Sequence, residues 1–261
     1  MPRLGLLFSL LLSCAISAPA ASAPASDPVA ITLAQESIAA LTGGATVTDV
    51  TVNANITSTL GSDNETGTGT LRAKGTTESR TDLNLSAGTL SEVRNILNGG
   101  PAGAWSHNGS AATAMAQHNA WIDAGWFFPP LSSLSQSANP QFIFRYIGQE
   151  QHDGLTVQHI RSYQLAPSVL SNSSIPGLST MDFYLDPNSF LPLAIDFNLH
   201  ADTNMGVNVP VEIRFANYQA VNGIQVPFHL QRLLNGSLVL DVMVTSVVLN
   251  TGLPDSLFTL Q

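Results

Sequence analysis

Tight-turn dipeptides separate a series of short alternating segments in the second half of the chain. Asp153-Gly154, Asn222-Gly223 and Asn235-Gly236 each lie between stretches of alternating apolar and polar residues. Such dipeptides are the strongest short-range signal of a two-residue hairpin, because both turn residues adopt positive φ. The alternating segments cover 142–146, 155–160, 181–185, 191–200, 211–218, 224–230 and 238–248. Their order predicts a meander of antiparallel strands with one buried face.

The first half begins with a helix signal and then changes to strand periodicity. Asp27-Pro28 is a typical helix start, because Asp suits the N-cap and Pro the first helical position. Apolar residues follow at three- and four-residue spacing until Gly43-Gly44 ends the pattern. Strand-like pieces then cover 50–60, 66–74 and 76–85. An amphipathic helix is therefore expected before the first strands.

A second helix signal follows these strands. Thr89 and Glu92 have the spacing of a capping box, in which each side chain bonds the backbone N–H of the other. Apolar residues at 93, 96 and 97 would give this helix a buried side, and Gly99-Gly100 would end it. The pattern predicts a short helix over 89–98.

All three tryptophans and a Phe-Phe pair fall between positions 105 and 134. Two prolines follow these aromatics directly and cannot lie in a central strand, so loop and short helix are predicted. Each ring can bury roughly 150–250 Å². The segment therefore either plugs an open sheet as permanent core or covers an apolar cavity as a lid. The candidate ligand-binding residues are Trp121, Trp126, Phe127 and Phe128.

The first 25 residues have the three parts of a secretory signal peptide. One positive charge at Arg3 precedes an apolar run over 4–17, and small residues over 18–25 suit cleavage. The run is shorter than the roughly 20 residues that span a membrane. Residues 26–261 are expected to form a single exported domain, periplasmic or secreted. Cys14, the only cysteine, is either lost with the signal peptide or lipid-modified as a membrane anchor.

The chain is acidic and carries few charged groups. Charged residues make up 10% of it, the formal net charge is −9, and Lys74 is the single lysine. Nucleic acids and anionic membrane surfaces attract clustered Lys and Arg. Neither is therefore an expected partner, whereas an apolar ligand or another envelope protein is compatible with this composition.

The sequence contains neither a Gly-x-Ser-x-Gly elbow nor a His-Glu-x-x-His motif. His152 and His159 are seven residues apart across a predicted turn, which is not a common ligand spacing. No metal or cofactor is expected. Asp182, Asp186 and Asp196 could pair in space as glycosidase carboxylates. Turn chemistry for Asp186 and a solvent-facing strand position for Asp196 explain them without catalysis, so the chain is predicted to be non-enzymatic.

An ordered set of short motifs resembles the C-terminal half of the LolA/LolB-like superfamily of periplasmic proteins. The motifs are Asp182-Phe-Tyr-Leu-Asp186, Leu191-Pro192, Phe215-Ala-Asn-Tyr218, Val221-Asn-Gly-Ile-Gln-Val-Pro-Phe228, Val247-Val-Leu-Asn250 and Leu253-Pro-Asp-Ser-Leu-Phe258. The resemblance implies an α+β fold, in which a curved antiparallel sheet forms an incomplete barrel with helices packed on its concave face. It also implies a cavity that holds acyl chains of lipids or lipoproteins.

Three functions follow from these observations, in decreasing order of support. The first is an exported envelope protein that binds a lipid or acyl chain in an apolar cavity without catalysis. This function requires a cavity of a few hundred Å³, the usual scale of ligand sites. The second is a structural or interaction module of the envelope with a filled core. The third is a hydrolase whose catalytic pair converges only in the folded chain.

Overall fold

The computed structural model describes residues 24–59, 64–166 and 174–260. Over these residues, thirteen antiparallel strands form one sheet. The strands are β1 (Asp49–Ser58), β2 (Glu65–Lys74), β3 (Glu78–Leu85), β4 (Gly88–Leu97), β5 (Gly100–His107), β6 (Thr113–Ala114), β7 (Phe142–His152), β8 (Leu155–Gln164), β9 (Met181–Leu185), β10 (Pro192–Ala201), β11 (Asn204–Val221), β12 (Ile224–Leu234) and β13 (Ser237–Leu249). Residues 1–23 of the expected signal peptide, including Cys14, lie outside the described residues.

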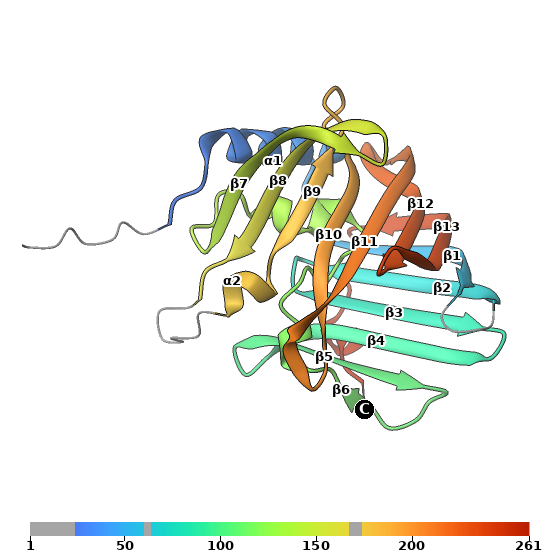
Figure 1. Cartoon of the computed structure of the whole chain (residues 1–261). Coiled ribbons are helices and arrows are strands. Elements are labelled where there is room, and N and C mark those ends of the chain that lie inside the picture. The colour runs from blue at the N-terminus through green and yellow to red at the C-terminus, as the bar shows by residue number, and fades with distance from the viewer. Residues whose placement is uncertain (1–23, 60–63, 167–173, 261) are drawn as a thin grey trace, which may run out of the picture.

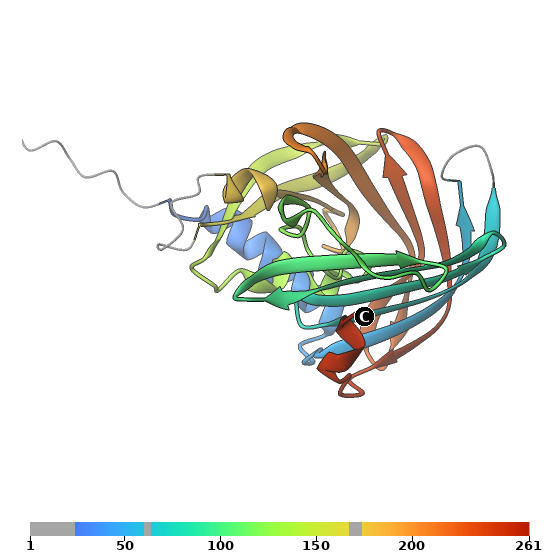
Figure 2. The same cartoon turned by 90° about the horizontal axis from the view of Figure 1, so that it is seen from below.

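Two meanders make up the sheet. The first runs from β1 to β6 and the second from β7 to β13, and β1 pairs with β13 to join them. The edges of the sheet are therefore β6 and β7, which do not pair with each other. Figure 1 shows the two meanders, and Figure 2 shows how the sheet curls around its contents without closing. The predicted fold class, an incomplete barrel with helices on its concave face, is confirmed.

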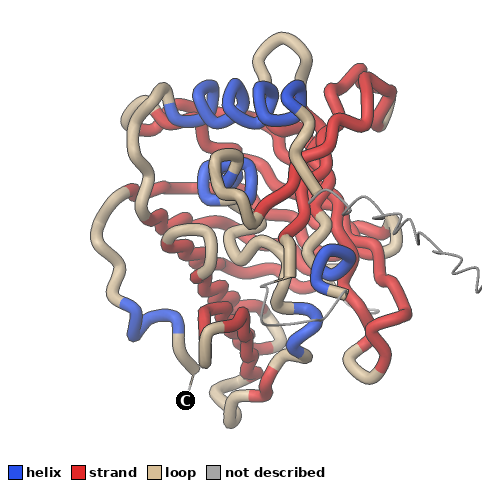
Figure 3. Tube along the Cα trace, turned by 90° about the vertical axis from the view of Figure 1, so that its left-hand side faces the viewer, coloured by secondary structure: helices blue, strands red, loops and turns tan. Residues whose placement is uncertain are grey.

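Short helices complete the described part of the chain. They are α1 (Pro28–Thr42), α2 (Ile175–Leu178) and the 3₁₀ helices η1 (Gln117–Asn119), η2 (Pro129–Leu131), η3 (Ser133–Gln136) and η4 (Asp255–Phe258). None of the helices among the described residues is long and apolar enough to cross a membrane. Figure 3 shows α1 lying across the open side of the sheet.

Helix α1 has the predicted bounds, but Asp27 at its N-terminus does not make the predicted capping bond. Gly43 ends it in the left-handed conformation at φ 59°, and its N–H donates to the Ala39 carbonyl at 2.8 Å. The Asp27 side chain makes no capping bond. Its carboxylate instead accepts from the Tyr146 N–H at 3.1 Å and pairs with Arg145 at 3.0 Å. The start of the helix is thus fixed to the edge strand β7.

The helix predicted over 89–98 is wrong, because these residues form β4 between β3 and β5. Glu92 bonds Arg94 two residues along the same strand face at 3.0 Å, and the Thr89 N–H donates to the Asn108 side chain instead. Gly99 lies in the turn between β4 and β5. Two backbone ladders outweigh one local capping box, since most stability of a short segment comes from tertiary packing.

The middle of the chain is partly as predicted. Trp105 belongs to β5, which covers the first three residues of the segment predicted as loop and short helix, and β6 covers two more. From position 115 onward the loop and short-helix prediction is confirmed by η1, η2 and η3. Residues 115–141, which connect β6 to β7, are called the inner segment below. Because β6 and β7 are opposite edges of an open sheet, this connection crosses the concave side.

A candidate ligand cavity on the concave face

The inner segment is packed into the core of the molecule. Every residue from 122 to 134 is buried, including both prolines. Trp126, Phe127 and Phe128 belong to one hydrophobic cluster that also contains residues of α1 and of both meanders. The Trp126 and Phe127 rings meet edge to face, with centroids 5.6 Å apart. These aromatics fill the part of the half-barrel that the sheet does not close.

Polar contacts fix the inner segment at two places. The Asn119 side-chain amide donates to the His200 carbonyl at 2.8 Å and accepts from the His200 N–H at 2.7 Å, which ties η1 to β10. Asp123 accepts both the N–H and the hydroxyl of Ser133, and that hydroxyl lies 2.9 Å from Ser162 on β8. Buried polar groups with satisfied partners rigidify the structure around them.

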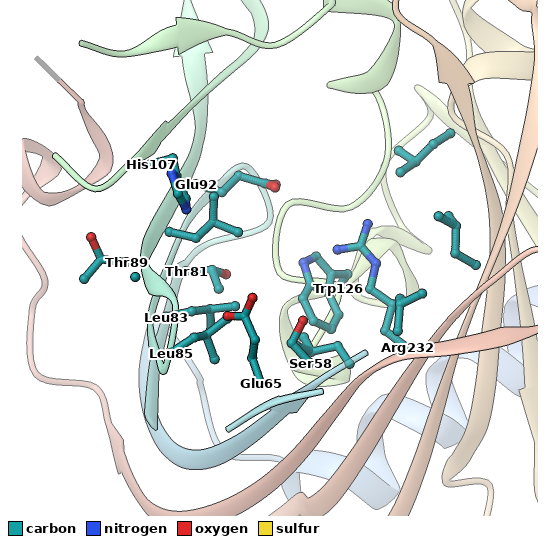
Figure 4. A pocket seen from close by; sticks show the side chains of 16 residues that line it. Ser58, Glu65, Thr81, Leu83, Leu85, Thr89, Glu92, His107, Trp126 and Arg232 are labelled. Atoms are coloured by element: carbon teal, nitrogen blue, oxygen red, sulfur yellow. The ribbon is translucent and has the colours of Figure 1, made fainter. Parts of the chain in front are cut away.

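Beside Trp126, the packing leaves a cavity of about 370 Å³. It lies between the wall formed by β2, β3 and β4 and the wall formed by β12 and β13, as Figure 4 shows in part. Leucines form most of its apolar lining: Leu83, Leu85, Leu90, Leu199, Leu234 and Leu240. The volume lies within the usual range of ligand pockets, roughly 300–1,000 Å³.

Two charged side chains enter this mainly apolar space. The Arg232 guanidinium carbon lies 5.2 Å from the Trp126 ring centroid, a cation–π distance. Glu92 faces the cavity from β4 and pairs with Arg94 at 3.0 Å. Burial alone would raise the pKa of Glu92, but Arg94 and Arg232 outweigh it and hold that pKa below its usual range. Burial lowers the pKa of Arg232, opposed by Glu92 and reinforced by Arg94.

The four aromatic candidates have different positions. Trp126 lines the cavity. Trp121 lines a smaller hollow of about 190 Å³ that residues of β4 and β5 also border. Phe127 and Phe128 line neither of these two cavities and are buried in the core. Of the four candidates, the structure brings only Trp126 to the larger cavity, and ligand binding by these residues stays a prediction.

Sequence reasoning missed Arg232, although a signal was present. Phe228, Leu230, Arg232 and Leu234 occupy alternate positions of one strand. Successive side chains of a strand point to opposite faces, so an arginine at this place lies on an otherwise apolar face. A charged residue in such a row is uncommon unless it has a partner or a function.

A second cluster of polar residues lies on the convex face. Ligand atoms of His152, Asp196 and Glu212 lie within 4.8 Å of one another, and the Tyr184 ring stacks on His152 at 3.8 Å. Burial, with Glu212 adding to it, raises the pKa of Asp196 to about 6. Asp196 thus lies on the strand face away from the core, as predicted, but it is half-buried there: the Tyr184 hydroxyl donates to it at 3.2 Å, and His152 lies beside it.

These three side chains could offer ligand atoms to a divalent cation, although the histidine spacing in the sequence gave no sign of it. Both carboxylate oxygens of Glu212 already accept from Arg214, at 2.8 Å and 3.1 Å. The guanidinium thus supplies the positive charge that a cation would bring, and the cluster is an ion-pair network. Elsewhere on the sheet, His159 bonds Asp182 and His229 bonds Asp241.

Comparisons with known proteins give a result at the level of the fold. No protein-family model matches the sequence, and no curated protein matches it. Among solved structures, a Vibrio parahaemolyticus domain named as an outer membrane lipoprotein-sorting protein has a TM-score of 0.58 at 14% identity, covering 88% of this chain and 96% of that one. A DUF1329 family protein from Desulfovibrio piger has a TM-score of 0.56 at 11% identity, with the same coverage.

A third solved structure carries the family name. This LolA superfamily protein from Nitrosomonas europaea has a TM-score of 0.50 at 11% identity, and the match covers 88% of this chain and 97% of that one. At such low identity the likeness concerns the fold, and it extends over nearly the whole of each compared chain. The resemblance found in the sequence is thereby confirmed for the architecture: this chain has the fold of the LolA superfamily.

Proposed function

We propose that this protein is a non-enzymatic, exported envelope protein that binds a lipid or acyl chain in the concave cavity. The observation that carries the proposal is the leucine-lined space of about 370 Å³ beside Trp126. Burying a methylene group contributes roughly 0.8 kcal/mol. A chain of ten or so methylenes would therefore gain enough from this lining to remain bound despite the entropy lost on binding.

The fold and the N-terminal sequence support the same function. One structurally similar protein is named for lipoprotein sorting, and another is named as a LolA superfamily protein. Residues 1–25 have the pattern of a secretory signal peptide, which would bring the chain to the compartment where such ligands occur. A Cys14 lipid anchor remains the alternative to complete removal of this segment.

In this proposal Trp126 is a fixed wall of the cavity. The inner segment is buried from 122 to 134 and is held by Asn119 and Asp123, which favours permanent core over a lid. Phe127 and Phe128 then support Trp126 from behind, and Trp121 faces the smaller hollow. A ligand would then enter from the open side of the sheet or between its strands, and not by movement of the inner segment.

The test is mass spectrometry of an organic extract from protein purified natively from an envelope. We expect a stoichiometric lipid from the unaltered protein and its loss in Leu90→Trp, because the larger ring fills the cavity that Leu90 lines. Leu97→Trp is the matched control, since Leu97 lies on the same strand and is 61% exposed. Both variants should keep the far-UV spectrum of the sheet.

A clean extract, together with no binding of added lipids, would reject the proposal and favour an interaction module. Exposed apolar side chains at two hairpins, among them Leu97 and Met205, would then be the first surfaces to examine for a protein partner. Ester hydrolysis that is lost in His107→Ala would contradict the non-enzymatic part, since His107 is the histidine that lines the cavity.

A further inference from the structure

No carboxylate among the described residues bonds Arg232 directly, although the charge of Glu92 acts on it. Within the described ranges, its guanidinium forms no hydrogen bond and no ion pair, and it lies over the face of the Trp126 ring. The side chain is half-buried, and the surface that it leaves open borders the cavity. A guanidinium has five N–H donors, so this group brings unsatisfied donors to an apolar space.

The nearby acidic groups do not satisfy Arg232. Glu92 is engaged by Arg94 at 3.0 Å, and Arg94 also donates to the Asn119 carbonyl at 3.0 Å. Glu65 lines the cavity as well, and in Figure 4 it lies beside Leu83 and Leu85, across the space from Arg232. Glu92 and Arg94 neutralise each other, so Arg232 is the surplus charge at its end of the cavity.

The strand geometry aims Arg232 at the cavity. The pairing of β12 with β13 shifts register between Arg232 and Leu233, with Val239 as the extra residue on β13. Such bulges re-aim side chains and recur next to functional sites. Val239 and Leu240 both line the cavity, so the irregularity falls at its wall.

We infer that the ligand is an amphiphile with an anionic head group, a long-chain carboxylate, whose oxygens pair with Arg232 while its chain lies along the leucines. This inference rests on the proposed function and adds the class of ligand to it. Carboxylates match the planar fork of a guanidinium and bond it in bidentate fashion. The pair would satisfy donors whose burial without a partner is costly. One surplus cation suits one monoanionic head group.

The test compares two ligands of equal chain length on the unaltered protein. Oleate and oleyl alcohol are titrated below their aggregation limits at pH 8, with intrinsic tryptophan fluorescence and calorimetry as readouts. We expect oleate to bind about tenfold or more tightly, because hydrogen bonds to charged groups contribute roughly 1.5–3 kcal/mol. This comparison needs no variant and so does not depend on how a substitution affects folding.

Variants then assign the preference to its residue. Arg232→Gln should reduce the oleate preference to within about twofold while oleyl alcohol still binds, and Arg232→Lys should keep part of it. Arg161→Gln is the matched control, because Arg161 pairs with Asp182 on the opposite face of the sheet. Its oleate preference should equal that of the unaltered protein.

Each other outcome has a distinct meaning. Equal binding of oleate and oleyl alcohol to the unaltered protein would overturn the head-group inference and leave the proposed function in place. Binding of neither ligand would overturn the proposed function itself. Hexadecyl phosphate is the third ligand, and a preference for it over oleate would replace the carboxylate by a phosphate head group.

Discussion

Asp123 is an acidic residue inside the molecule, with 7% of its surface exposed. Burial raises its pKa from 3.8 to about 6, although two hydrogen bonds from Ser133 act in the opposite direction. The native state therefore binds a proton more tightly than the unfolded chain does between about pH 4 and pH 6. Where the native state binds more protons than the unfolded state, the free energy of unfolding falls as pH rises. Asp123 thus destabilises the fold at neutral pH.

Asp123→Asn is expected to stabilise the protein at pH 7.5 by roughly 1–3 kcal/mol and to have little effect at pH 4. The amide oxygen can still accept from Ser133, while the buried charge is gone. Urea unfolding at both pH values measures the difference, with Glu36→Gln on the exposed side of α1 as the control. An equal loss of stability at both pH values would mean that hydrogen-bond geometry, rather than charge, decides the effect.

At the scale of elements, local periodicity predicted most of the strands and failed where a ladder competes with a local motif. The alternation of apolar and polar residues between Asn-Gly turns predicted the C-terminal strands. This was possible because the two-residue side-chain period of a strand does not depend on which strands it pairs with. Thr89 and Glu92 also fit a helix start, and only the flanking strands β3 and β5 decide for strand. The local sequence of residues 89–98 does not show that β3 and β5 pair with it.

The cavity was predictable as a kind of site, and its residues were not. The large apolar surface of the aromatic side chains made Trp126 and its neighbours candidates for a ligand site. Which ring touches the cavity depends on how residues 115–141 cross from β6 to β7, a property of the whole sheet. In the sequence, Arg232 is a charged residue among apolar residues at alternate strand positions. That no carboxylate bonds it directly is shown only by the structure, in which Glu92 pairs with Arg94.

Gly88 and Gly99 flank most of β4 and allow a matched test of that strand. Gly88 has φ 147°, and a Cβ there would lie 2.1 Å from the Asn108 side-chain oxygen. Gly99 has φ 79° with open space around it. We expect Gly88→Ala to lower the free energy of unfolding by roughly 1–3 kcal/mol beyond the effect of Gly99→Ala. Urea denaturation checks this. A neutral or stabilising Gly88→Ala would instead suit a helix at this position.

At the scale of the whole molecule, the open sheet encloses a cavity and has two edge strands, β6 and β7. Unpaired edge strands can recruit other chains, so natural proteins shorten or cover them. Here β6 has two residues, and β7 is covered by the chain that leads into α1. The Asp27 N–H donates to the Phe144 carbonyl at 2.9 Å, and the Ser26 hydroxyl accepts from the Phe144 N–H at 3.0 Å.

Asp27 is thus expected to protect the edge of the sheet rather than to cap the helix. Asp27→Ala removes the acceptor for the Tyr146 N–H and the partner of Arg145. It should cost about 1–2 kcal/mol of stability and increase self-association, measured by urea unfolding and light scattering. Asp27→Asn keeps an acceptor and should recover most of the loss. Hydrogen exchange separates the two roles: faster exchange at Tyr146 supports edge protection, and faster exchange confined to the first turn of α1 contradicts it.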